Sequence, residues 1–153
     1  MGRLKVEIKE SKSLQKEMKK LIKKSKTLKV GFFKNAKYPD GTNVADVAYW
    51  NEYGTSTSPA RPFFRTAIRK NSKKWVENFK KDIEHFDFDY DKALSLLGVD
   101  ASNDIRESII DWSEPANSPA TIKRKGFNDP LVETHNMEKS VNWELDNESS
   151  SNS

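Results

Sequence analysis

The stretch from residue 44 to residue 65 constrains this chain more than any other. It predicts a short amphipathic helix, a glycine stop, a polar loop and a second helix that begins with a proline. Asn43 is placed to cap the first helix by accepting its free N–H groups, and Gly54 stands where a left-handed residue would end it. Pro62 suits the first turn of the next helix, where its missing N–H would have no partner. The stretch therefore predicts two helices joined by a tight corner.

Large side chains are concentrated around this corner. Aromatic residues surround a loop that carries Arg61 and Arg65, which fits a buried corner covered by its arginines. The same residues fit an assembly surface, because aromatic and Arg side chains supply most hot-spot energy in protein interfaces. Tyr53, Phe63 and Phe64 suit a core role as well as an interface role. The residues proposed for the assembly interface are Trp50, Asn51, Glu52, Tyr53, Arg61, Pro62, Phe63, Phe64 and Arg65.

The chain has 153 residues, a length that fits one domain, but its composition is poor in hydrophobic residues. Hydrophobic residues make up 35% and charged residues 33%, and the mean hydropathy is −0.86. With so little apolar content, burial would only marginally offset the conformational entropy that a monomer loses on folding. We therefore expect partner contacts to contribute to the stability of the fold. The chain has no cysteine, which excludes disulfides and thiolate chemistry. No stretch approaches the ~20 apolar residues of a membrane helix, so we expect no membrane partner.

Positive charge is concentrated at the start of the chain. Residues 1–38 contain 13 Lys and Arg against three Glu, a net charge of +10, which leaves −6 for residues 39–153. Such a basic end suits nucleic acid or an acidic protein surface, and it equally suits the solvated face of a helix. The residues proposed for contacts with DNA in a channel or with a partner are Lys19, Lys20, Lys23 and Lys24, with a second basic group at Lys123, Arg124 and Lys125.

The hydrophobic periods predict an α+β fold. Residues 3–9 and 27–33 alternate polar and apolar residues as strands do, and residues 14–22 have the spacing of a one-sided helix. Residues 141–145 return to period two and predict a further strand, which would bring the two ends of the chain together. The expected sheet is small, antiparallel or mixed, and packed with several helices. We expect one domain over residues 1–146 and a disordered tail over 147–153.

Two long helices are expected in the middle of the chain. Apolar residues recur at helical spacing over residues 62–86 and again over residues 94–112, where Gly98 is a local weak point. The break at residues 87–91 is short enough that the two helices should pack antiparallel. Two shorter helices are expected, one from Ser118 to a stop at Gly126 and one between Leu131 and Lys139. The apolar stripe of the first long helix predicts core packing in preference to a ligand groove; its members are Phe64, Ile68, Trp75, Phe79 and Ile83.

No catalytic pattern accompanies these elements. His85 and His135 fall on different predicted elements, and neither has a metal-binding spacing with another His. The aspartates of residues 87–91 lack the glycine and the distant glutamate of a calcium loop. The sequence also has no nucleophile elbow and no glycine-rich phosphate cradle. We therefore expect a protein that is not an enzyme and that has no metal and no cofactor.

Two blocks of sequence resemble a known family. The run Asn51-Glu52-Tyr53-Gly54-Thr55, followed by residues 59–65 (Pro-Ala-Arg-Pro-Phe-Phe-Arg), is similar to the signature of the tail-completion proteins of tailed bacteriophages and prophages. These are neck proteins of head-to-tail joining. The second block covers residues 117–126, 130–134 and 137–140. The family usually reads Thr-Gly-x-Leu/Met-x-x-Ser in its last part, and His135 stands here at the position of the glycine.

The resemblance implies a structural virion protein of the tail or neck, present in the host cytoplasm during assembly. Its partners would be copies of itself in a ring, with hexameric symmetry expected, together with other neck and tail proteins and the passing phage DNA. Heterologous contacts between identical subunits close into rings when the rotation permits, which is the geometry that a tail requires. The interface residues around the corner are expected to make such contacts.

Other functions fit parts of the sequence. A tail terminator or a head-closure (stopper) protein can share a small α+β architecture, and fold resemblance alone does not decide among them. A more distant alternative is a nucleic-acid-binding protein that acts through residues 1–38, which predicts binding with a steep salt dependence. A small hydrolase is a third class, but the sequence nominates no residue for it.

Overall fold

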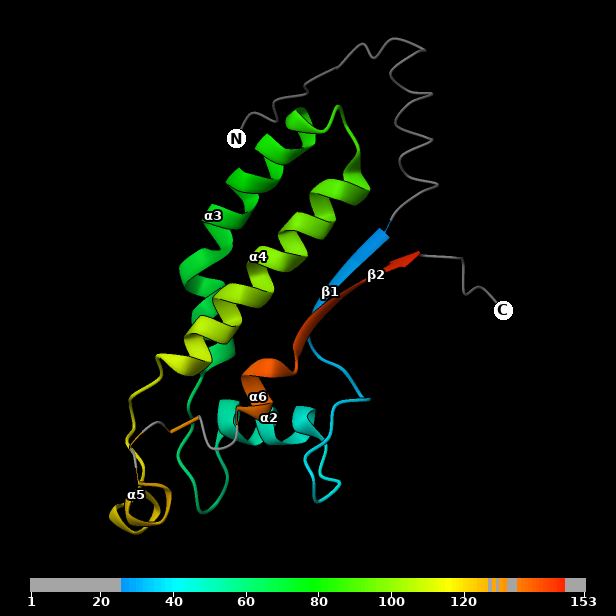
Figure 1. The fold of residues 1–153 in the computed structure, drawn as a ribbon. Helices are drawn as coiled ribbons and strands as arrows, with labels where there is room; N and C mark the ends of the chain where they lie inside the picture. Colours follow the sequence, from blue (N-terminus) through cyan, green and yellow to red (C-terminus); the bar gives the residue numbers. More distant parts are fainter. Residues whose placement is uncertain (1–25, 127, 129, 132–134, 148–153) are drawn as a thin grey trace, which may run out of the picture. The chain divides into compact units, whose positions relative to one another are not determined.

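The computed structural model describes residues 26–126, 128, 130–131 and 135–147 (Figure 1). The strand expected at residues 3–9, the helix expected at 14–22 and the lysines between 19 and 24 lie outside the described residues. Residues 28–145 form one compact unit. The described elements are, in chain order, β1 (Lys26–Phe32), α2 (Val44–Tyr53), α3 (Phe63–His85), α4 (Tyr90–Ile110), α5 (Pro119–Lys125), α6 (Asn136–Lys139) and β2 (Val141–Asn147).

The two described strands pair with each other although they stand at opposite ends of the described chain. β1 and β2 form a two-stranded antiparallel sheet, which runs beside α4 in Figure 1. Alternating apolar residues in both segments provide the faces that such a sheet buries. The predicted α+β fold, with a small sheet made from the chain ends and packed with helices, is therefore confirmed.

The two long helices, α3 and α4, form an antiparallel hairpin, as predicted (Figure 1). Helix α3 ends because Asp87 and Phe88 take left-handed backbone conformations, with φ of 50° and 62°. The Asp89 side chain then accepts a hydrogen bond of 3.2 Å from the Lys92 N–H and caps α4. The short acidic break is thus a turn and a helix cap. None of the described helices combines the length and the apolar character needed to cross a membrane.

Polar side chains fix how the two long helices lie against each other. The Trp75 indole Nε1 donates to Asp104 Oδ2 at 2.5 Å, and Lys74 Nζ lies 2.8 Å from the same oxygen. Asp104 is mostly buried, whereas Lys74 is half exposed. A carboxylate on α4 that binds two neighbouring residues on α3 permits one register of the hairpin, because a shift of one helical turn would break both bonds.

The hydrophobic core lies where α2 and α6 meet the open end of the α3–α4 hairpin, at which α3 begins and α4 ends. Val44, Phe63 and Ile109 are fully buried there, and Ile105 and Val141 are buried beside them. Phe63 meets Phe32 of β1 edge to face, with ring centroids 6.2 Å apart. The core therefore joins the corner of residues 44–65 to the sheet and to α4.

Gly98 has a different role from the expected weak point in α4. Gly98 is buried, and a Cβ added to it would lie 2.6 Å from Cδ2 of Trp143 on β2. The indole occupies the space that any other residue's side chain would take. Gly98 is therefore the position at which β2 can cross α4 closely, and the helix keeps its hydrogen bonds through it.

The caps predicted from the sequence are present at some helix ends and absent at others. Ser118 caps α5 by accepting from the Thr121 N–H, and Gly126 ends α5 with a left-handed backbone, φ 82°. The Asn43 side chain does not cap α2 as predicted; its Nδ2 donates to Asp46 Oδ2 instead, at 3.1 Å. Pro62 precedes α3 and does not lie within its first turn. Helix α6 spans Asn136–Lys139, within the predicted segment 131–139, of which residues 132–134 lie outside the described residues.

Candidate functional site

The corner between α2 and α3 is closed by backbone hydrogen bonds around Gly54. The Gly54 N–H donates to the Trp50 carbonyl at 2.8 Å, and the Arg61 N–H returns to the Asn51 carbonyl at 2.6 Å. Gly54 has φ 77° and ψ 174°, and a Cβ there would lie 2.8 Å from the Ala60 nitrogen. This backbone conformation and this close approach both require glycine. The loop therefore folds back onto the end of α2 instead of leading away from it.

Glu52 connects the two helices of the corner. Its carboxylate accepts from the Phe64 N–H at 2.9 Å, from the Arg65 N–H at 3.2 Å and from Arg65 Nε at 2.7 Å. Only 5% of Glu52 is exposed, so these bonds replace the water that its charge loses on burial. The first N–H groups of a helix have no partner within the helix, and they carry its positive dipole end. Glu52 therefore caps α3 from the last turn of α2.

Two further buried residues attach the corner to the rest of the unit. Arg61 is 8% exposed, and its Nε donates to the Pro115 carbonyl at 3.1 Å. Burial lowers the pKa of this guanidinium from its ordinary value. The Ser108 hydroxyl of α4 donates to the Phe63 carbonyl at 2.8 Å. The loop after α4 and α4 itself thus hold the corner from outside. We conclude that the corner is rigidly placed.

Three aromatic side chains stand on the outer side of α2. Tyr49, Trp50 and Tyr53 are 61%, 48% and 54% exposed, and we call them the aromatic face. The rings of Tyr49 and Tyr53 lie 4.7 Å apart, and the Arg65 guanidinium lies 4.9 Å from the Tyr53 ring. Arg65 is in turn held by Glu52, so the network that closes the corner also orients the edge of this face. Clustered exposed aromatics of this kind are typical of binding surfaces.

The structure divides the nine interface candidates into three groups. Glu52, Arg61 and Phe63 are buried and hold the corner, and Asn51, Pro62 and Phe64 are half-buried. Trp50, Tyr53 and the outer half of Arg65 remain on the surface. The candidate surface therefore narrows to the aromatic face. Tyr49, which the interface prediction had omitted, joins it, and its position one turn before Tyr53 was the signal for it.

A long apolar groove runs beside α3, where the sequence predicted core. It has a volume of about 390 Å³, and we call it the α3 groove. Its walls include Val30 of β1, Ile68, Trp75, Val76 and Phe79 of α3, and Leu97 of α4. Ile68 and Val76 are 41% and 53% exposed. The prediction that this stripe is core holds only in part. Phe64 packs against the buried cluster, whereas Ile68 is exposed and lines the groove with Trp75 and Phe79. The fully buried side chains of α3 are those of Phe63 and Ala67 on the neighbouring face.

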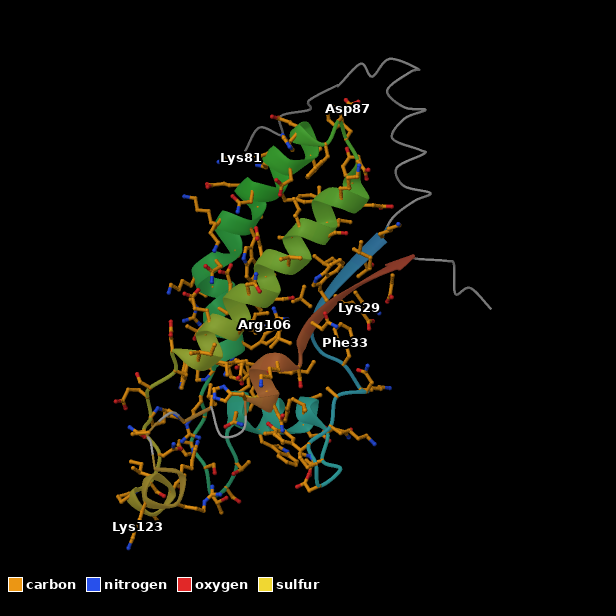
Figure 2. All side chains as sticks on the ribbon, in the orientation of Figure 1. Lys29, Phe33, Lys81, Asp87, Arg106 and Lys123 are labelled. Atoms are coloured by element: carbon orange, nitrogen blue, oxygen red, sulfur yellow. The ribbon has the colours of Figure 1, made fainter. Side chains whose placement is uncertain are left out.

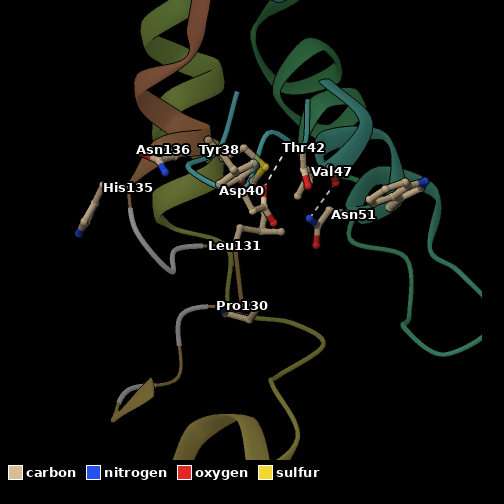
Figure 3. A pocket seen from close by; sticks show the side chains of 11 residues that line it. Tyr38, Asp40, Thr42, Val47, Asn51, Pro130, Leu131, His135 and Asn136 are labelled. Atoms are coloured by element: carbon tan, nitrogen blue, oxygen red, sulfur yellow. Dashed lines mark hydrogen bonds between the residues drawn. The ribbon is translucent and has the colours of Figure 1, made fainter. Parts of the chain in front are cut away.

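A second hollow, of about 430 Å³, is lined by Val47, Trp50 and Asn51 of α2 (Figure 3). Tyr38, Asp40 and Thr42 line it from the loop before α2, and Leu131 faces them from the segment before α6. The Thr42 N–H bond holds the pKa of the Asp40 carboxyl below its usual range. The hollow is open, and its described lining is about as apolar as it is polar.

His135 stands at the edge of this hollow and points away from it (Figure 3). Its backbone has φ 58° and ψ 14°, a left-handed conformation that glycine adopts without strain. The ring nitrogen Nδ1 lies 2.5 Å from Oε1 of the buried Glu138. The left-handed backbone is therefore present with a histidine at the position where the resembling family has glycine, and the bond to Glu138 fixes the ring.

The basic residues of the second group lie on α5. Lys123 projects outward at the far side of this helix (Figure 2), Arg124 is also exposed, and Lys125 is half-buried. His85 is in the last turn of α3, where a basic side chain suits the helix dipole. Within the described ranges, no three His, Asp or Glu side chains gather in a way that could hold a metal ion.

Comparison of the chain with models of protein families, with curated proteins and with solved structures gives no match. A function for this chain is therefore inferred from the geometry of the corner and from the two sequence blocks.

Proposed function

We propose that this chain is a structural virion protein that completes a phage tail and takes part in head-to-tail joining, by assembling as a ring at the neck. The observation that carries the proposal is the aromatic face of α2 on its rigid support. Tyr49, Trp50 and Tyr53 gather on one exposed helix face, and buried Glu52 and Arg61 hold that helix in place. An exposed aromatic cluster on a preorganised support loses little entropy on binding.

The sequence blocks support the same function from a separate direction. Residues 51–55 and 59–65, on which the family resemblance depends, are the residues that build the corner. Gly54 and Glu52 determine the shape of the corner, whereas Trp50 and Tyr53 are exposed on its surface. The proposal thus assigns an assembly role to the region where the resemblance is densest. A lean composition, which favours order through partner contacts, agrees with it.

The experiment that tests this function is electron microscopy of lysates in which the gene for this chain alone is disrupted. We expect filled heads to accumulate apart from free tails, because the joining step would lack its ring. Complementation with the unchanged chain should restore joined, infectious particles. Normal infectious particles without the chain would overturn the proposal.

Complementation with variants separates the surface from the fold. We expect Trp50→Ala combined with Tyr53→Ala to leave heads and tails apart while the variant chain stays folded. The matched control is Phe88→Ala, which removes another exposed aromatic, 62% exposed, at the far end of the hairpin. The control should join heads to tails. If the α2 variant joined them equally well, the aromatic face would have no part in assembly.

A further inference from the structure

We infer that the aromatic face of α2 in one copy seats in the α3 groove of the next copy, so that identical subunits join head to tail. The inference rests on the proposed function and deepens it, because it names both halves of the contact. The two surfaces belong to different elements of one compact unit. A contact between two different surfaces of identical chains is heterologous, and repetition of it closes a ring when the rotation permits.

The groove has the chemistry that an aromatic side chain requires. Among the described residues that line it, Ser72 is the one with a hydroxyl. The other polar group of these described side chains, the Trp75 indole N–H, is already bonded to Asp104. Its volume of about 390 Å³ exceeds that of a single large side chain. Exposed Ile68 and Val76 form its outer wall and would be buried by the contact. The aromatic face offers the matching apolar area on the opposite partner.

Charge complementarity favours a second copy as the occupant. Asp46 is exposed on the outer side of α2, one turn before Trp50 and between the positions of the three aromatic residues on the helix surface. The flank of α3 beside the groove carries Arg69, Lys73 and Lys80, all exposed. The exposed Asp46 carboxylate thus has basic side chains to meet along the groove, whereas Arg65, at the edge of the aromatic face, is already paired with Glu52. The same chain supplies both complementary patterns, as a ring of identical subunits requires.

Cysteine cross-linking tests the geometry directly, because the full chain contains no cysteine of its own. Tyr49→Cys places a thiol at the edge of the aromatic face and keeps Trp50 and Tyr53. Ser72→Cys places a thiol of similar size inside the groove. Under mild oxidation, we expect each variant alone to remain uncross-linked and the mixture of the two to give a covalent dimer. Val99→Cys, on the exposed surface of α4, is the control partner for Tyr49→Cys and should give none.

Two outcomes would overturn the inference. Cross-linked dimers from Tyr49→Cys alone would indicate that aromatic faces meet each other, which is an isologous contact. No cross-link in the mixture would mean that the groove receives another protein or nothing. Neither outcome affects the test of the proposed function, because separated heads and tails in the gene disruption would still place this chain at the joining step.

Matched substitutions give a second measurement. Val76→Asp puts a charge on the groove wall, and Val99→Asp puts the same charge on a similarly exposed helix position outside it. We expect Val76→Asp to weaken self-association in sedimentation equilibrium by tenfold or more, and Val99→Asp to leave it within about twofold. Exchanging charges, with Asp46→Lys on one chain and Lys73→Glu on another, should restore part of the association that each loses alone. Equal effects of the two valine substitutions would contradict the inference.

Discussion

The α2–α3 corner and the crossing of α4 with β2 join their elements by opposite means. At the corner a buried carboxylate, Glu52, binds the first N–H groups of α3 and the Arg65 side chain. At the crossing, Gly98 leaves room for the Trp143 indole, and what decides the contact is shape. A polar junction depends on charge and bond geometry, whereas a steric junction depends on volume. The two regions should therefore fail under different substitutions.

The largest effect is expected at Phe63, in the core beneath the corner. Phe63 is fully buried, so Phe63→Ala should lower the free energy of unfolding by about 3–5 kcal/mol, measured by chemical denaturation. Phe88→Ala, at an exposed ring, should change it by less than about 0.5 kcal/mol. A small loss at Phe63 would mean that the corner is held by its polar bonds alone, which would sharpen the contrast with the crossing.

Glu52→Ala tests the polar junction. The substitution leaves the Phe64 and Arg65 N–H groups without their acceptor, and the half-exposed Arg65 side chain loses the carboxylate but keeps its bond to the Glu52 backbone carbonyl. We expect the free energy of unfolding to fall by about 2–4 kcal/mol, with Glu52→Gln losing less because an acceptor oxygen remains. Thermal and urea unfolding measure both. A loss under about 1 kcal/mol would show that water replaces the carboxylate, and the corner would then not depend on charge.

Gly98→Ala tests the steric junction, and its sign is the informative result. Alanine usually stabilises a helix interior by about 0.5–1 kcal/mol relative to glycine. Here its Cβ would lie 2.6 Å from the Trp143 ring, so we expect a loss of about 1–3 kcal/mol instead.

Trp143→Ala provides the control for that substitution. In the Trp143→Ala background the obstruction is gone, and Gly98→Ala should then stabilise α4. The double-mutant cycle measures the coupling between the two positions. If Gly98→Ala destabilised the chain equally in both backgrounds, the crossing would not be a steric fit between these two residues.

The smallest effect is expected at the hairpin turn, which belongs to neither junction. The Lys92 N–H bond holds the pKa of the Asp89 carboxyl below its ordinary value. A depressed folded pKa means that charged Asp89 stabilises the folded state above the unfolded pKa of about 3.9, and that this contribution is lost as the pH falls through the folded value. Asp89→Asn should therefore lower the melting temperature slightly at pH 7 and leave it unchanged near pH 2. A difference that persisted at pH 2 would contradict an electrostatic origin.

The sequence predicted most of the elements from Lys26 onward, because their signals are local. The turn at residues 87–89 follows from its own aspartates, and Ser118, Pro119 and Gly126 mark both ends of α5. The pairing of β1 with β2 could be predicted because both segments alternate with period two. The aromatic face could be predicted in part, since large residues cluster there, but the sequence did not separate its exposed members from buried Phe63.

Tertiary structure alone decided the features that depend on partners far along the chain. Glu52 became a cap for α3 because Gly54 turns the chain back by an amount that no spacing rule specifies, and the Gly98–Trp143 fit joins residues 45 positions apart. The apolar stripe of α3 had the period of a core helix, yet the way α3 packs left it lining a groove. The chain's own residues determined which helices and strands form, because those energies are local. Which apolar faces were buried and which remained open was decided by packing, since one face can be covered only where another element reaches it.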